Sequence, residues 1–243
     1  MFPEICRIGP FTVYSYGFML VAAFLVGVYL ASCQAQKEGL GKDLVFNLCF
    51  TSFICGILGA RIFYIAENLN YYVQNPLETI MLQHGGLAWF GGLLSGLAAA
   101  ALYLRGKRLP PYKVLDIIVP FLALAQAIGR IGCLLNGCCF GRPSEAGLYF
   151  AVHGATLVPT QVYSTLLLLA IFIILRLFQD APHKSGQIFY TYLLLYSLKR
   201  FFIEFWRADN RLIFSGLTLF QLMSIVIFAV SIIKLFLIAK RKE

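Results

Sequence analysis

The sequence predicts an all-α polytopic membrane protein with about seven transmembrane helices, which form one integral membrane domain over residues 1–243. Of its 243 residues, 60% are hydrophobic and only 13% are charged, whereas about 25% of the residues of soluble domains are charged. Long stretches such as residues 8–36 contain no Asp, Glu, Lys or Arg at all. Seven apolar runs approach the roughly 20 residues that a helix needs to cross a bilayer.

Each of these runs is expected to form a helix, because a chain inside lipid has to satisfy its own backbone hydrogen bonds. The runs cover residues 12–33, 44–66, 86–104, 115–136, 161–178, 187–206 and 214–237. The first run is expected to be a retained helix, because the preceding MFPEICRIGP has neither a basic leader nor a small-residue cleavage site.

The basic residues are distributed unevenly along the chain, whose net charge is +9. With seven spans, one set of loops together with the C-terminal tail holds Lys37, Lys42, Arg105, Lys107, Arg108, Lys113, Arg176, Lys184, Lys234, Lys240, Arg241 and Lys242. The opposite set holds only Arg7, Arg142, Arg207 and Arg211. Positive loops stay cytoplasmic, so we expect the N-terminus outside and the C-terminus inside. The basic excess then serves topology and contact with membrane lipids, and no nucleic-acid partner is expected.

Four basic residues fall within the predicted spans: Arg61, Arg130, Lys199 and Arg200. A charge at membrane depth costs about 2.5 kcal/mol or more, so it is usually paired or functional. Arg200 and Glu204 are one helical turn apart and can pair with each other, but Arg61 and Arg130 have no such partner in their own runs. Guanidinium groups grip phosphate with two hydrogen bonds. We therefore predict that Arg130 binds a phospholipid phosphate, with structural pairing as the alternative.

A glycine-rich stretch, HGGLAWFGGLLSG at residues 84–96, opens the third predicted span. Gly92 and Gly96 form a small-xxx-small pair that favours close helix packing. Alternatively, backbone amides at the start of a helix cradle an anion. The stretch is compatible with both interpretations.

The fourth span closes with GRIGCLLNGCCFGRP, which contains Cys133, Cys138 and Cys139. Zinc sites usually present Cys-x2-Cys pairs, so this spacing fits zinc poorly and no metal is expected. The first interpretation is close helix packing along small residues that recur every four positions: Gly129, Cys133, Gly137 and Gly141. A disulfide formed in an oxidising compartment and a reactive thiolate beside Arg130 are the alternatives.

Taken together, six segments resemble the prolipoprotein diacylglyceryl transferase family: IGPFTVYSYGFML, LGARIFY, HGGLAWFGGLLSG, GRIGCLLNGCCFGRP, PTQVYS and LKRFFIEFWRADNR. They occur in this order over nearly the whole chain. The resemblance implies an enzyme that moves the diacylglyceryl group of phosphatidylglycerol to the lipobox cysteine of a lipoprotein precursor. Glycerol phosphate would be released at the outer side of the bacterial cytoplasmic (inner) membrane, and no cofactor is implied.

The resemblance also implies site residues. Arg130, Arg200 and Tyr16 are the catalytic candidates, and His84 is the candidate base, with His153 as an alternative. The expected substrate-binding residues are Arg61, Gly85, Gly86, Gly91, Gly92, Asn136, Gly137, Gly141, Gln161, Tyr163, Glu204 and Arg207.

Several positions depart from the family pattern. Phe90 stands where the family usually has histidine, Cys138 replaces an acid, and Ser164 replaces a glutamate. The candidate phosphate ligands are retained while candidate proton acceptors are missing. Two other functions therefore stay open. One is a divergent phospholipid-dependent transferase with another acceptor or thiol-based chemistry, and the other is a non-catalytic lipid-binding membrane protein.

Overall fold

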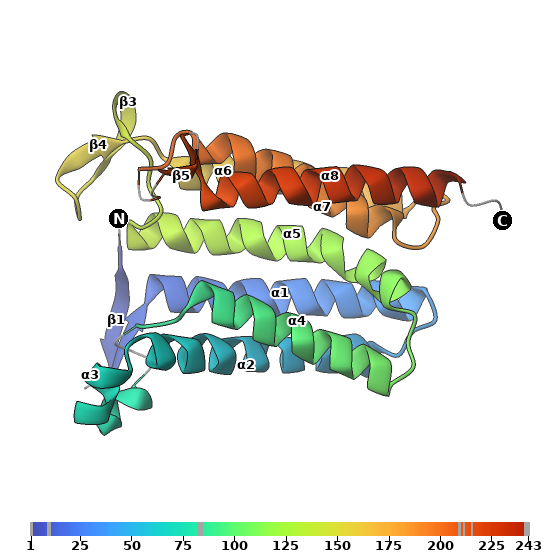
Figure 1. Ribbon diagram of the computed structural model, residues 1–243, viewed down its shortest axis with the longest axis horizontal. Coiled ribbons are helices and arrows are strands. Elements are labelled where there is room, and N and C mark those ends of the chain that lie inside the picture. The colour runs from blue at the N-terminus through green and yellow to red at the C-terminus, as the bar shows by residue number, and fades with distance from the viewer. Residues whose placement is uncertain are drawn as a thin grey trace. The chain divides into compact units, whose positions relative to one another are not determined.

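The computed structural model (Figure 1) describes residues 2–8, 11–81, 85–208, 210, 212–214 and 216–240. Its long helices are α1 (Ser15–Lys37), α2 (Lys42–Glu67), α4 (Trp89–Gly106), α5 (Pro111–Asn136), α6 (Thr160–Gln179), α7 (Gln187–Glu204) and α8 (Leu219–Lys240). A short helix, α3 (Leu69–Gln74), and a 3-10 turn, η1 (Pro76–Thr79), follow α2. Each predicted apolar run therefore corresponds to one long helix.

Within the described ranges, five of these helices are long and apolar enough to cross a membrane, namely α1, α2, α5, α6 and α8. The apolar part of α4, Phe90–Gly106, is shorter, and α7 includes Lys199, Arg200 and Glu204. The predicted all-α membrane class is confirmed, and the chain is a multi-pass membrane protein. Spans at α4 and α7 stay predictions.

The chain divides into two compact units. The first comprises Met1–Ala31 and Leu115–Glu243, and the second comprises Ser32–Val114. This division does not test whether the chain forms one integral membrane domain, which stays a prediction.

The first unit is built around α5, α6 and α7. Its apolar core contains Val119 and Ala123 of α5, Ile171 and Leu175 of α6, and Ile188 and Tyr192 of α7.

A buried carboxylate also joins α5 to α7. Asp116 of α5 accepts hydrogen bonds from the backbone N–H groups of Gly186 and Phe189, at 2.5 and 2.7 Å. The N-terminus of a helix carries unpaired N–H groups and a partial positive charge, which stabilise a carboxylate there. This contact fixes where α7 begins relative to α5.

Three two-stranded antiparallel hairpins were not predicted. They are β1–β2 (Glu4–Ile8 with Phe11–Tyr14), β3–β4 (Pro143–Phe150 with Ala155–Leu157) and β5–β6 (Leu212–Phe214 with Leu217–Thr218). The backbone N–H of Phe2 donates to Leu135 near the end of α5, which places β1 there. In Figure 1, β3, β4 and β5 lie at the end of this unit where α5 stops and α6 starts. The hairpins thus gather around the end of the unit that carries the site.

The second unit is organised by close packing of α4 on α2. A Cβ added to Gly92 would lie 3.3 Å from the Cβ of Ala60, and one added to Gly96 would lie 3.2 Å from the backbone oxygen of Ser52. The space is already filled at both positions. The helix-packing interpretation of the glycine-rich stretch is therefore confirmed for this pair.

Candidate active site

The segment GRIGCLLNGCCFGRP (residues 129–143), called the signature segment below, leaves α5 through a Schellman motif. Gly137 adopts a left-handed conformation (φ +74°). Its N–H donates to Leu134 at 3.2 Å, and the N–H of Cys138 donates to Cys133 at 3.1 Å. This pair of bonds satisfies the last carbonyl groups of a helix, and glycine tolerates the required backbone angle. The chain therefore turns sharply at Gly137 instead of continuing as a helix.

The predicted packing stripe of small residues is wrong. Because α5 ends at Asn136, Gly137 and Gly141 do not lie on a helical face. A Cβ added to Gly129 would meet nothing within 4 Å. The close contact occurs instead at Gly132, where an added Cβ would lie 2.8 Å from the Cβ of Met19.

Side chains from two other segments anchor the loop that follows α5. Gln161 donates to the carbonyl of Cys138 and Thr160 to that of Cys139, each at 2.6 Å. His153 is 2.8 Å from the carbonyl of Gly137 and therefore donates through Nε2–H. This bond gives His153 a structural contact in the loop. Thr160 was missed as a site residue, although it lies in the PTQVYS segment.

Gly141 joins the same loop to the end of α7. It forms an isolated β-bridge with Arg207, and the N–H of Arg142 donates to the carbonyl of Trp206 at 2.8 Å. A Cβ at Gly141 would lie 2.6 Å from that backbone oxygen and 2.8 Å from the Cβ of Val158. Only glycine fits here without moving backbone, because Cβ atoms are essentially never found at such distances.

Three arginines, from α5, α7 and the segment after α7, form a positive cluster at this end of the unit. Arg130 lies near the end of α5, Arg200 lies in the last turns of α7, and Arg207 follows α7. The charges of Arg130 and Arg207 both act on Arg200. The buried Lys199 is also within reach of all three, and its Nζ lies 4.4 Å from the centre of the Tyr196 ring.

Arg200 has the partner that the sequence predicted. Its Nη2 lies 3.0 Å from Oε2 of Glu204, and its guanidinium stacks on Phe220 at 4.4 Å. The other carboxylate oxygen, Oε1, accepts hydrogen bonds from Thr218 and Asn210 at 2.9 and 2.6 Å. The ion-pair prediction for Arg200 and Glu204 is confirmed.

Arg130 differs from Arg200 in its contacts. It is half-buried within α5, yet among the residues that the structure describes it makes no hydrogen bond and no ion pair. Its charge acts on Tyr16 and on Cys139, which places these groups around it. No described residue therefore occupies the N–H donors of Arg130.

Tyr16 reaches the cluster from the start of α1. Gly132 allows α1 to pack closely here, because a Cβ there would lie 2.8 Å from the Cβ of Met19, one turn after Tyr16. The tyrosine side chain is 42% exposed and lies within electrostatic range of Arg130 and the cysteines of the loop. A phenol beside this guanidinium can donate a hydrogen bond to an anion bound there.

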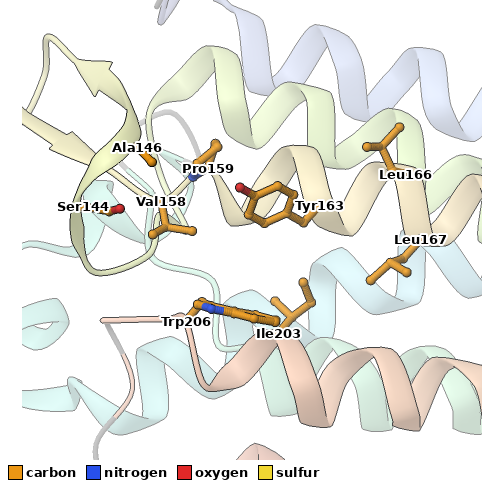
Figure 2. Close-up of a pocket in the computed structure, with 9 residues that line it drawn as sticks. All are labelled: Ser144, Ala146, Val158, Pro159, Tyr163, Leu166, Leu167, Ile203 and Trp206. Atoms are coloured by element: carbon orange, nitrogen blue, oxygen red, sulfur yellow. The ribbon is translucent and has the colours of Figure 1, made fainter.

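An apolar pocket of about 560 Å³ opens beside the loop. Figure 2 shows Tyr163, Leu166 and Leu167 of α6 on one side, with Ile203 and Trp206 facing them. The pocket is completed by Ser144, Ala146, Val158 and Pro159. It offers an apolar surface next to a polar, positively charged end of the helices.

Gln161 is almost fully buried (1% exposed). Its amide nitrogen holds the loop carbonyl of Cys138, but its Oε1 has no hydrogen-bond partner in the described part of the chain. A buried acceptor without a partner costs about 1–3 kcal/mol. The Oε1 of Gln161 is therefore a buried acceptor without a partner among the described residues.

One cysteine of the last turn of α5 and two of the loop that follows it meet in space. The Sγ atoms of Cys133, Cys138 and Cys139 all lie within 4.8 Å of one another, with Cys133 buried and the other two partly buried. All three are free cysteines in the structure. The Schellman motif brings the three sulfurs together, although the spacing of the cysteines along the chain does not predict their proximity.

The remaining candidates belong to the second unit. Arg61 is buried (6% exposed), and its guanidinium makes five hydrogen bonds, to the backbone carbonyls of Glu78, Thr79, Met81, Gly85 and Gly86. These bonds use all the N–H groups of an arginine. Any effect of Arg61 on a substrate would therefore act through the loop that it holds.

The glycines of this unit have separate roles. Gly85 and Gly86 both have φ near +80° and present their carbonyls to Arg61. Gly91 and Gly92 lie in the first turn of α4 against α2, and a Cβ on Gly91 would lie 2.6 Å from the backbone oxygen of Gly59. His84 lies outside the described residues.

The sequence matches the family model of prolipoprotein diacylglyceryl transferases over residues 3–237. It is 36% identical to the phosphatidylglycerol–prolipoprotein diacylglyceryl transferase of Bacillus cytotoxicus, over 97% of this chain and 91% of the relative. It is 34% identical to the protein of that name from Staphylococcus aureus, over 95% and 86%. It is 32% identical to the one from Clostridium tetani, over 93% of each chain.

Proposed function

The chain belongs to the prolipoprotein diacylglyceryl transferase family, and we propose that it transfers the diacylglyceryl group of phosphatidylglycerol to a prolipoprotein cysteine, releasing glycerol phosphate. The observation that carries the proposal is Arg130, a guanidinium in a membrane helix without a hydrogen bond or ion pair among the described residues. A charge at membrane depth needs a partner. The anion that a bilayer supplies is a phospholipid phosphate.

In this proposal Arg130 and Arg200 hold the phosphate from two helices. The pairing of Arg200 with Glu204 uses one edge of its guanidinium and fixes the orientation of the rest. Arg207 adds a third positive charge to the cluster. A planar guanidinium grips two phosphate oxygens at once, which an ammonium cannot do.

The chemical step is a displacement at carbon. The thiolate sulfur of the acceptor cysteine attacks the glycerol carbon that carries the phosphate ester, so a C–S bond forms as the C–O bond breaks. The electron pair goes to the phosphate oxygen, and the guanidinium groups stabilise the charge that develops there. The thiol proton passes to a base, because the thiolate is the reactive form. Our candidate for this base is His84.

The neighbouring residues would bind the rest of the lipid. The glycerol headgroup carries hydroxyl groups, and the unpartnered Oε1 of Gln161 is an acceptor for one of them. Tyr16 would donate to the phosphate. The pocket beside Tyr163 (Figure 2) suits an acyl chain, since it is lined mainly by apolar side chains.

The signature loop would position these ligands. Gly141 permits the contact between the loop and the segment after α7, and Asn136 with Gly137 forms the turn. In the second unit, Arg61 shapes the loop that contains Gly85 and Gly86, while Gly91 and Gly92 bring α4 close to α2. These residues would thus act by positioning.

We further propose that the protein lies in the bacterial inner membrane, with the N-terminus outside and the C-terminus in the cytoplasm. Within the first unit, the arginine site lies at the end opposite to Lys184 and Lys240, which fits basic residues on the cytoplasmic side. The acceptor would carry a lipobox cysteine, and nucleic acid would have no role. A reporter fused after Glu243 and active only outside the cytoplasm should be silent, and an active fusion would contradict this topology.

The experiment that tests the function incubates the purified chain with labelled phosphatidylglycerol and a lipobox peptide. We expect glycerol phosphate release together with a gain in peptide mass equal to one diacylglyceryl group. Arg142→Lys, in an exposed arginine of the same loop, is the matched control and should behave like the parent. Release without a peptide product would indicate another acceptor. Binding of the lipid without any release would indicate a non-catalytic lipid-binding protein.

A further inference from the structure

The three sulfurs at the end of α5 meet because of how the helix terminates. In a Schellman motif, the residue two positions after the cap commonly contacts the residue three positions before it. Cys138 and Cys133 occupy these two positions, as their backbone hydrogen bond shows. The two cysteines are five residues apart in the sequence, a spacing that does not suggest a shared site. The Schellman motif nevertheless brings their side chains together.

Cys139 completes the group from a strained conformation. Its φ of +63° lies in the left-handed region, which a residue with a side chain adopts only when its surroundings impose it. The surroundings here are the hydrogen bonds from Thr160 and Gln161 to the carbonyls of the loop. The three sulfurs are thus held within 4.8 Å of one another by a braced loop.

We propose that Cys133, Cys138 and Cys139 bind one thiophilic divalent metal ion of the zinc type through three thiolates. A tetrahedral zinc–thiolate site has Zn–S bonds of about 2.3 Å, which corresponds to sulfur separations of roughly 3.8 Å. The observed limit of 4.8 Å requires only a small inward movement. The fourth coordination position would be open to water or another small ligand.

The charges around the cluster favour the metal-bound form. Three thiolates and one divalent cation carry a net charge of −1, and the positive charges of Arg130 and Arg207 act on Cys139. These arginines would repel a bare cation but stabilise the anionic complex.

Metal binding requires all three cysteines as thiolates and releases their protons, so binding should weaken as the pH falls.

The test uses the full chain in detergent, purified under reductant and stripped of metal. Titration with Co²⁺ should give a sulfur-to-cobalt charge-transfer band that saturates at one ion per chain, and Zn²⁺ should abolish this band. Zn²⁺ should also protect Cys138 and Cys139 from alkylation. If the parent protein showed no such band, the proposal would be overturned, whatever its transferase activity.

A matched pair of variants locates the site. Cys138→Ser with Cys139→Ser should weaken binding more than about 100-fold, since even residues that only support metal ligands contribute 10–100-fold. Cys33→Ser with Cys49→Ser, in α1 and α2, removes the same number of thiols and should bind like the parent. Helix content by circular dichroism checks that both variants fold. An unchanged cobalt band in the first variant, or its loss only in the second, would refute the assignment.

Discussion

Arg61 and Arg130 are alike in the sequence, but their surroundings in the structure are opposite. Each is an arginine in an apolar helix without an acidic partner one turn away. Arg61 is surrounded by five backbone carbonyls. Arg130 makes no hydrogen bond or ion pair with any residue that the structure describes.

The contrast separates two uses of an intramembrane charge. Where protein acceptors occupy all N–H groups, the arginine holds a loop and has no donor left for a ligand. Where the arginine makes no hydrogen bond or ion pair with the described residues and further positive charges lie nearby, we expect it to bind an anionic ligand. Arg200 is intermediate, because it has one carboxylate partner and an aromatic neighbour.

The largest effect should come from Arg61→Ala. The substitution leaves several carbonyl groups without a donor, and we expect it to lower the free energy of unfolding by about 3–5 kcal/mol. Thermal unfolding in detergent measures the change. Arg105→Ala, at an exposed arginine at the end of α4, should be nearly neutral. If the two variants were equally stable, the structural role of Arg61 would be wrong.

Arg130→Lys should have the opposite effect to Arg61→Ala, because it should lower turnover and leave stability nearly unchanged. Stability should stay within about 0.5 kcal/mol of the parent, because no partner among the described residues is lost. Turnover of phosphatidylglycerol should fall roughly ten- to a hundred-fold, which corresponds to about 1.5–3 kcal/mol of transition-state stabilisation. Glycerol phosphate release and thermal unfolding on the same preparation check both parts. A marked loss of stability with normal turnover would mean that Arg130 is structural.

Gly141→Ala should destabilise the loop. The added Cβ meets the backbone of Trp206 and the side chain of Val158, and overpacking of this kind costs about 1–3 kcal/mol. Gly129→Ala is the control, since open space surrounds that position and alanine favours a helix by up to about 1 kcal/mol. Thermal unfolding should thus shift in opposite directions. Equal shifts of the unfolding temperature in the two variants would contradict this prediction, because the loop would then accommodate the added Cβ.

The smallest effect is expected for His153→Phe. It removes one hydrogen bond to Gly137, worth about 0.5–1.5 kcal/mol, and keeps an aromatic ring beside Phe140. Turnover should stay within about three-fold of the parent, because a bond of this size is at most a small perturbation of the loop. A loss of a hundred-fold or more at normal stability would identify His153 as the base.

The helices were predictable because length and apolar composition alone define a membrane span, and each run matched one helix. The pair of Arg200 and Glu204 was predictable because a helix places such residues together. The five partners of Arg61 were not predictable, since they are backbone carbonyls that every residue possesses. The meeting of Cys133 with Cys138 was missed for a similar reason, because it depends on the left-handed turn at Gly137. The hairpins were missed because they are short segments at or near the ends of the long apolar runs.

The central claim is that Arg130 and Arg200 hold one phosphate together. A double-mutant cycle with Arg130→Lys, Arg200→Lys and the double variant tests it most directly, with kcat/KM for phosphatidylglycerol as the readout and thermal unfolding as the check on folding. Two contacts to one phosphate should be coupled, so the double variant should differ from the sum of the single effects by more than about 0.5 kcal/mol. Strictly additive effects, or single variants that turn over the lipid like the parent, would contradict the shared phosphate site.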